Sequence, residues 1–208
     1  GHFPNSHPDG KESGHWFDCD RHKPSLAAAK ILLGFANDCE FNFTVNGLSD
    51  NLATLMDTFF RLTERDWAQG RTKIVMLQSE FFSDQAVAHS VLQRAIQTAV
   101  DFGIFQFEER PTPESLILKI EPDEKGLYDT QKIIDTIEAN YHQIKLICLS
   151  DIVFNTGQRL ELSKILNKLR RGIERDKIVV GLDLAHSAGN RFINLKALGV
   201  TFAVGCAY

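Results

Sequence analysis

Two hydrophobic patterns alternate along the chain. Short runs that are apolar throughout and end in small or polar residues are typical of buried strands. Longer segments in which apolar residues recur every three or four positions are typical of amphipathic helices. In the segment "GLSDNLATLMDTFFRL", for example, one helical face carries Leu48, Leu52, Leu55, Met56 and Phe59.

The predicted elements alternate between strands and helices. Helices are predicted at 24–37, 47–62, 83–103, 128–141 and 157–176. Strands are predicted at 73–78, 144–150, 177–184 and 200–208, with strands or extended segments at 104–110 and 115–120. Apolar strands that alternate with helices indicate a parallel sheet covered on both sides. The predicted fold class is therefore α/β, a mostly parallel open sheet with helices on both faces.

The amino-terminal part of the chain differs from the rest. Residues 1–23 contain Pro4, Pro8, Gly10 and Gly14 and are predicted to be loop. Together with the helix that follows, they form a first region at 1–45, and the sheet domain is expected at 46–208.

Composition and charge narrow the classes of partner. The chain has 208 residues, 43% hydrophobic and 24% charged, as in a soluble protein with a core. A formal net charge of −4 without a long basic run argues against nucleic acid as the main partner. No apolar segment approaches the roughly 20 residues that span a bilayer, so no membrane partner is expected. The four cysteines form no C-x-x-C pair and the histidines are not spaced like metal ligands, so we expect no metal site. We expect the cysteines to be reduced thiols in a cytoplasmic protein.

Polar residues follow three of the predicted strands. The segments are Ser79–Asp84, Ser150–Thr156 and Asp183–His186. In open parallel sheets, ligands bind beyond the carboxyl ends of the strands. We therefore expect a ligand site at this edge of the sheet.

Asp183 ends the apolar run "KIVVGLDL", and two roles are open for it. A carboxylate at the end of a buried strand can cap the following turn or form a structural ion pair. It can instead pair with a protonated ring nitrogen, as an aspartate does for the pyridinium nitrogen of pyridoxal 5′-phosphate (PLP).

Two further segments are compatible with such a cofactor but do not require it. Gly47, Leu48 and Ser49 open a predicted helix, whose N–H groups and dipole favour an anion such as phosphate, although most helix starts bind only water or a cap. Phe81 and Phe82 directly follow a strand. A phenylalanine at that place either belongs to the core or lies flat on a cofactor ring.

Several segments taken together resemble kynureninase, a PLP-dependent family of fold type I, the aspartate aminotransferase-like superfamily. They are "CLSDIVFNTGQ" (148–158), "GLDLAHSAGN" (181–190) and "GVTFAVGCAY" (199–208). "NGLSDNLATLM" and "FFSD" are similar to the family's phosphate loop and ring-stacking segment. Order and spacing fit from Asn46 to Tyr208.

The resemblance implies contacts for the matching residues of the first two segments. Leu48 and Ser49 would hold the cofactor phosphate, and Phe81 would stack on the ring. The other members of the same ring-binding segment are Phe82, Ser83 and Asp84.

The later segments and the amino terminus supply the remaining implied roles. Ser150 and His186 would line the ring, and Asp183 would pair with the pyridine nitrogen. Tyr208 would bond the phosphate and act as general acid and base. His2, in a short match to a Gly-His of the family, would approach the substrate as part of a substrate loop in region 1–45.

The activity that the resemblance implies is hydrolytic cleavage of L-kynurenine, or 3-hydroxykynurenine, to the corresponding anthranilate and L-alanine in tryptophan degradation. The lysine that binds PLP covalently would be residue 209, directly after Tyr208. The family's carboxyl-terminal small domain would lie outside this sequence. A cytoplasmic homodimer that binds a small amino-acid substrate is expected.

Three alternatives remain open for the sequence. Another fold type I enzyme, such as a cysteine desulfurase or selenocysteine lyase, is disfavoured because those typically stack a histidine where this chain has Phe81. A non-catalytic PLP-fold protein is the second alternative. The third is an α/β domain without a cofactor, in which Asp183 and His186 merely form a turn.

Overall fold

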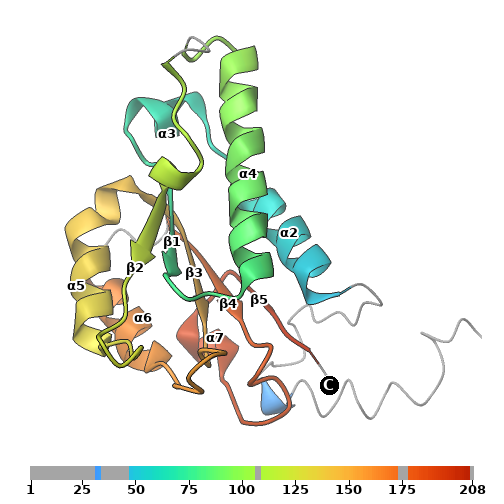
Figure 1. Ribbon diagram of the computed structural model, residues 1–208, viewed down its shortest axis with the longest axis vertical. Coiled ribbons are helices and arrows are strands. Elements are labelled where there is room, and N and C mark those ends of the chain that lie inside the picture. The colour runs from blue at the N-terminus through green and yellow to red at the C-terminus, as the bar shows by residue number, and fades with distance from the viewer. Residues whose placement is uncertain (1–30, 34–46, 106–108, 173–177, 207–208) are drawn as a thin grey trace, which may run out of the picture.

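A five-stranded sheet forms the centre of the protein, which a computed structural model describes at residues 31–33, 47–105, 109–172 and 178–206. The strand order is β2-β1-β3-β4-β5, and every neighbouring pair is parallel (Figure 1). The strands are β1 (Lys73–Leu77), β2 (Ile117–Ile120), β3 (Ile144–Ser150), β4 (Val179–Asp183) and β5 (Phe202–Val204). This arrangement confirms the predicted parallel α/β fold.

Helices connect the strands and cover the sheet. They are α2 (Leu48–Phe59), α3 (Glu64–Ala68), α4 (Phe82–Asp101), α5 (Thr130–Asn140), α6 (Leu162–Gly172) and α7 (Leu195–Leu198). Two short 3-10 helices lie at Glu114–Leu116 and Tyr141–Gln143. The predicted helices at 47–62, 83–103, 128–141 and 157–176 are therefore confirmed with shorter bounds, while most of the helix predicted at 24–37 lies outside the described residues.

Two short helices were not predicted because they are too short to show a period. α3 is started by Thr63, whose side chain accepts the Asp66 N–H while the Asp66 side chain accepts the Thr63 N–H, a reciprocal capping box. α7 is capped by the side chain of Asn194 and ends at Gly199, which has a positive φ of 58°. A left-handed residue at a helix end is most easily supplied by glycine.

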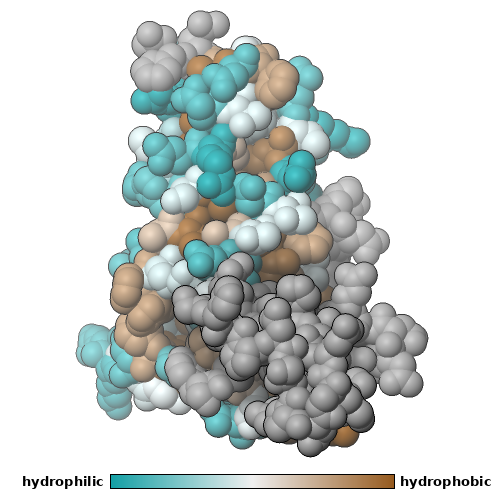
Figure 2. All heavy atoms as spheres, turned by 90° about the vertical axis from the view of Figure 1, so that its right-hand side faces the viewer, coloured by the Kyte–Doolittle hydropathy of each residue, from teal (hydrophilic) through white to brown (hydrophobic). Residues whose placement is uncertain are grey.

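The sheet has a separate hydrophobic core on each face. On one face α2 and α4 pack over apolar side chains of β1, β3 and β5, including Ile74, Leu146 and Phe202. On the other face α5, α6 and α7 cover residues such as Leu149 and Leu182. Figure 1 shows α4 and α2 on one side of the sheet and α5 and α6 on the other, as predicted. Seen from the α4 side, polar side chains in teal surround scattered apolar ones over the coloured upper part of the surface (Figure 2).

The packing of β4 against β5 depends on a glycine. Gly181 is paired in register with Phe202, and a Cβ atom at 181 would collide with the Phe202 ring. The same ring stacks on Phe59 of α2, with the ring centroids 5.6 Å apart. The lack of a side chain at Gly181 thus allows one aromatic contact to join β4, β5 and α2.

Strand alternation places the polar strand ends on one face. Ser150 is paired with Asp183, and Asp183 with Val204. Residues paired across a sheet point to the same face, and side chains alternate between faces along a strand. Ser150 and Asp183 therefore share the face of Cys148 and Val204, which is the face covered by α2 and α4. The strand order reverses between β1 and β3, which is where open α/β sheets bind ligands.

One expectation for the middle of the chain is not met by the described residues. The extended segment predicted at 104–110 contains no strand at 104–105 or 109–110. Instead, Phe105 packs edge-on against Trp67 of α3, with the ring centroids 5.0 Å apart, so its apolar surface is buried outside the sheet. Within the described ranges, no helix has the length and apolar composition to cross a membrane.

Candidate active site

Three buried carboxyl groups meet at the carboxyl edge of the sheet. Glu80 follows β1, Asp84 lies in the first turn of α4, and Asp183 is the last residue of β4. Their side chains are almost inaccessible, at 4%, 1% and 7% exposure respectively. The charge of Asp183 raises the pKa of both Glu80 and Asp84, and the charge of Glu80 raises that of Asp84. The three therefore form a single electrostatic group, which we call the acid cluster.

Asp84 and Asp183 form the closest pair in the acid cluster. Burial, the charge of Asp183, the hydrogen bond between the two carboxyl groups and the charge of Glu80 together raise the pKa of Asp84 to about 8. The pKa of Asp183 is also raised by burial, but the Ala185 N–H, which donates to Oδ1 over 2.7 Å, and the hydrogen bond with Asp84 oppose that shift. Asp84 therefore holds the proton near neutral pH and donates it to the carboxylate of Asp183.

Glu80 is joined to the end of β3. The Ser150 N–H donates to Glu80 Oε1 over 3.0 Å, and the Ser150 hydroxyl donates to Oε2. Burial raises the pKa of Glu80 to about 7, and these two hydrogen bonds limit the rise. Ser150, which we predicted to line a cofactor ring, thus has its hydroxyl proton directed at Glu80.

No strong cation balances the acid cluster within the described ranges. No lysine or arginine there forms an ion pair with Glu80, Asp84 or Asp183. His186 is exposed in the turn after β4, and its charge interaction with Asp183 is the weakest of the influences on that carboxyl. Among the described residues, no group of three or more His, Cys, Asp or Glu side chains, the acid cluster included, is arranged so that it could hold a metal ion. A buried acid pair of this kind favours a cationic hydrogen-bond donor as its ligand.

Two phenylalanines, Phe81 and Phe82, lie between Glu80 and Asp84 in the sequence. Phe81 directly precedes α4 and is 38% exposed, so it is not a core residue. Its ring lies 4.3 Å from that of Phe82, centroid to centroid, and meets Phe154 edge-on at 5.2 Å. Phe82 is far more exposed, at 73%. Phe81 is thus half-exposed and held by two other aromatic rings, while Phe82 is mostly exposed. The stacking role of Phe81 stays a prediction.

The predicted phosphate segment lies at the start of α2. Leu48 and Ser49 are the first two residues of that helix, and the preceding Gly47 supplies no side-chain cap. α2 and α4 both begin at the end of the molecule where the strands end (Figure 1). The helix start therefore offers N–H groups for an anion on the same side of the sheet as the acid cluster.

The other predicted site residues have different outcomes. Ser83 is half-buried, and its hydroxyl donates to Asp84 Oδ1 over 3.2 Å, so it contacts the acid cluster. His186 lies at the predicted strand end. Tyr208 and His2 lie outside the described residues, and their roles stay predictions.

Two acids inside the predicted strand-end segments had no predicted role of their own. Glu80 comes three residues after β1 and carries a signal like that of Asp183, an acid near the end of an apolar strand. Asp151 follows β3, is fully buried, and pairs with Arg191, whose Nη1 lies 3.3 Å from Oδ2. Burial raises the pKa of Asp151, and the charge of Arg191 opposes that rise.

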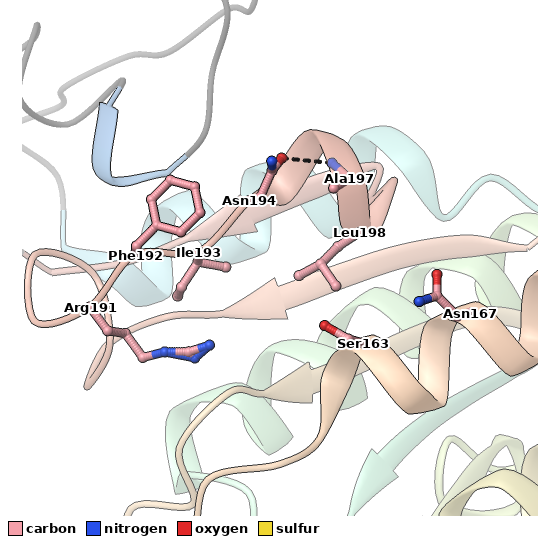
Figure 3. A pocket seen from close by; sticks show the side chains of 8 residues that line it. All are labelled: Ser163, Asn167, Arg191, Phe192, Ile193, Asn194, Ala197 and Leu198. Carbon is pink, nitrogen blue, oxygen red and sulfur yellow. Dashed lines mark hydrogen bonds between the residues drawn. The ribbon is translucent and has the colours of Figure 1, made fainter.

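A separate cavity of about 260 Å³ lies between α6 and the segment that leads into α7. Figure 3 shows Ser163 and Asn167 on the α6 side and Phe192 and Leu198 on the other. None of the predicted site residues lines it. The cavity is therefore distinct from the acid cluster.

Comparison with known proteins gives a consistent result. Models of known protein families give no match to the chain. It is 34% identical over 165 residues, 79% of its length, to kynureninase of Saccharomyces cerevisiae. It is 32% identical over 183 residues, 88% of its length, to kynureninase 1 of Neurospora crassa. The chain is kynureninase-like.

The kynureninase-like chain spans about a third of the length of these curated relatives, 32% and 33% respectively. Among solved structures, a cysteine desulfurase from Thermococcus onnurineus matches with a TM-score of 0.58 and 21% identity, over 89% of this chain and 38% of that one. At this identity the match shows the fold alone. The predicted family resemblance and fold class are thus both confirmed.

Proposed function

We propose that the kynureninase-like chain is the cofactor-binding part of a PLP-dependent hydrolase that cleaves L-kynurenine or 3-hydroxykynurenine to the corresponding anthranilate and L-alanine. The observation that carries the proposal is the buried Asp84–Asp183 pair, which has no lysine or arginine partner among the described residues. The half-exposed Phe81, which directly precedes the helix that carries Asp84, supports it.

The chemistry of the donor set fits PLP. A protonated pyridine nitrogen is a cationic donor, and Asp183 presents it with a carboxylate whose other contacts are the Ala185 N–H and the Asp84 carboxyl group. A flat ring bound there would lie beside Phe81, which offers an exposed aromatic face. The start of α2, at Leu48 and Ser49, suits the phosphate.

The chain's own residues would then act by holding charge and protons in place. When bound, PLP supplies an electron-accepting ring that stabilises the negative charge left when bonds to the substrate's reacting carbon break. Asp183 keeps the proton on the ring nitrogen, and Asp84 fixes the orientation of Asp183 by donating to it. Tyr208 would move protons at the reacting atoms, as the family resemblance implies.

The proposal extends to assembly and location. As the resemblance implies, we propose a homodimer in the cytoplasm, with a small amino acid as substrate. Sedimentation of the intact protein would measure the assembly, and a monomer with full activity would contradict that part of the proposal.

The direct test supplies PLP and substrate to the intact protein. With L-kynurenine as substrate, the fluorescence of anthranilate is followed. With 3-hydroxykynurenine as substrate, 3-hydroxyanthranilate is followed instead, and alanine is measured in both reactions. L-Cysteine, with sulfide as the readout, is the control for the cysteine desulfurase alternative. Anthranilate and alanine in equal amounts would support the proposal, whereas sulfide from cysteine without anthranilate would overturn it.

A further inference from the structure

Glu80 is a buried acid for which the proposed function has no assigned role. Its backbone is held on both sides: its N–H donates to the Leu77 carbonyl over 3.2 Å, and its carbonyl accepts from Gln85 Nε2 over 2.8 Å. Its side chain is 4% exposed. The carboxyl group is therefore fixed at the end of β1, where the strand order reverses.

Glu80 connects the ends of two neighbouring strands. Both donors of Ser150, the N–H and the hydroxyl, point to the Glu80 carboxylate. Ser150 in turn is paired in register with Asp183. With its proton directed at Glu80, the Ser150 hydroxyl can offer a ligand only its oxygen lone pairs. Glu80 thus determines which kind of group Ser150 can receive, namely a hydrogen-bond donor.

The charged and titratable groups near Glu80 belong to α4, β3, β4 and the turn after β4. Asp84 belongs to α4, Asp183 to β4 and the fully buried Cys148 to β3, and His186 interacts with the cluster through Asp183. Two of these four groups are carboxylic acids, Asp84 and Asp183. An amide in place of Glu80 would keep a hydrogen bond to Ser150 but would remove a negative charge. If Glu80 acts only through its hydrogen bond to Ser150, glutamine can replace it. If its charge matters, glutamine cannot.

We propose that Glu80 is a positioning residue of the cofactor site: its carboxylate fixes the Ser150 hydroxyl as a hydrogen-bond acceptor. Glu80 is also the third carboxyl group of the acid cluster, and it loses its proton when a cationic ring binds beside Asp183. The inference rests on the proposed function. A cation beside the cluster favours the ionised form of each acid, so ligand binding is linked to proton release. Because the pKa of Glu80 is about 7 before binding, its share of that release at pH 7 is up to about half a proton, and it is larger somewhat below pH 7.

The test measures protons released when PLP binds to the intact apoprotein. Calorimetric titration with PLP at pH 7, in two buffers of different ionisation enthalpy, gives the number of protons exchanged. Glu80→Gln should release about half a proton less than the unmodified protein, since a group near its pKa is half protonated. The matched control is Glu121→Gln, an exposed glutamate that directly follows β2 at the same edge, and it should release the unmodified number.

A second variant changes the proton count in the opposite direction. Ser150→Ala removes a hydrogen bond that favours ionised Glu80, so more Glu80 is protonated before binding and proton release should rise. Equal release from Glu80→Gln, Ser150→Ala and the unmodified protein would overturn the role of Glu80 while leaving PLP binding intact. Failure of the unmodified protein to bind PLP would instead overturn the proposed function, and the role of Glu80 with it.

Discussion

The carboxyl group of Asp84, in the first turn of α4, donates a hydrogen bond to the carboxylate of Asp183 at the end of β4. Asp84 lies at the amino-terminal end of a helix and Asp183 at the carboxyl end of a strand, and these two ends meet at one edge of the sheet. The pair is buried, and within the described ranges it has no lysine or arginine partner. It therefore presents a negative, oriented acceptor to any cationic donor that enters.

Replacing the two members of this pair should have unequal effects. Asp183→Asn removes the carboxylate, and loss of one partner from a buried charge pair costs about 3–5 kcal/mol, or roughly 100-fold or more in affinity. Asp84→Asn keeps an N–H donor toward Asp183 and should reduce PLP affinity by about tenfold or less. Affinity is measured by titrating the intact apoprotein with PLP.

The matched control for the acid pair is Asp135→Asn, an exposed aspartate on α5 that lies on the other face of the sheet. It should bind PLP like the unmodified protein. A larger loss in Asp84→Asn than in Asp183→Asn would show that the proton resides on Asp183, contrary to the assignment given above.

The acid cluster should make the apoprotein less stable as the pH rises. Its folded-state pKa values are raised, to about 7 for Glu80 and about 8 for Asp84, so the folded state binds more protons than the unfolded state. The free energy of unfolding should therefore fall by several kcal/mol as the pH rises from about 4 to about 9, and level off only above the pKa of Asp84. Urea unfolding at a series of pH values measures this.

Asp84→Asn provides the comparison for the pH series, since it removes the group with the highest of these pKa values. Its free energy of unfolding should vary less with pH than that of the unmodified protein, and should exceed it at pH 8.5. Stability that rises between pH 5 and pH 8 in the unmodified apoprotein would contradict the protonated state assigned to the cluster.

Phe81→Leu should weaken cofactor binding by about fivefold, because an aromatic stacking contact contributes about 1 kcal/mol beyond its buried area. The control is Phe102→Leu, at the other end of α4, where the phenylalanine is 80% exposed and far from the acid cluster. PLP titration of both variants measures the difference. If they retain the same affinity as the unmodified protein, Phe81 does not stack on the ring.

Gly181→Ala should destabilise the fold by about 1–3 kcal/mol, because the added methyl group collides with the Phe202 ring. The double variant Gly181→Ala with Phe202→Leu should recover part of that loss, since leucine can move aside. Urea unfolding of the single and double variants gives the coupling energy between them. Additive effects would show that the Phe202 ring is not what excludes a side chain at 181.

The sheet and the main helices could be predicted because burial dictates their sequence pattern. β1, β3 and β4 are covered on both faces and are apolar throughout, and α2 and α5 show a clear helical period. α7 has four residues, too few for a period, and only Asn194 and Gly199 mark its ends. At 104–110 the pattern resembled a strand because Phe105 is apolar, but its partner is Trp67 rather than a neighbouring strand.

The site could be predicted in part. The strand ends predicted that Asp183 and Ser150 lie at one edge of the sheet, because parallel strands finish at one edge, and the two are paired in register. Their contact with a ligand, and that of Phe81, stays a prediction. The pairing of Asp84 with Asp183 could not be read from the sequence, since it depends on how α4 is placed over β4. Glu80 lies in the predicted segment Ser79–Asp84, but its bonds to Ser150 depend on the pairing of β1 with β3, which the sequence does not give.

The central claim is that Asp183 receives the ring nitrogen of PLP. The most direct measurement is a crystal structure of the intact protein with PLP bound. The account predicts the pyridine nitrogen about 2.7–2.9 Å from a carboxylate oxygen of Asp183, with the ring against Phe81. A PLP ring bound elsewhere, or a nitrogen facing away from Asp183, would contradict it.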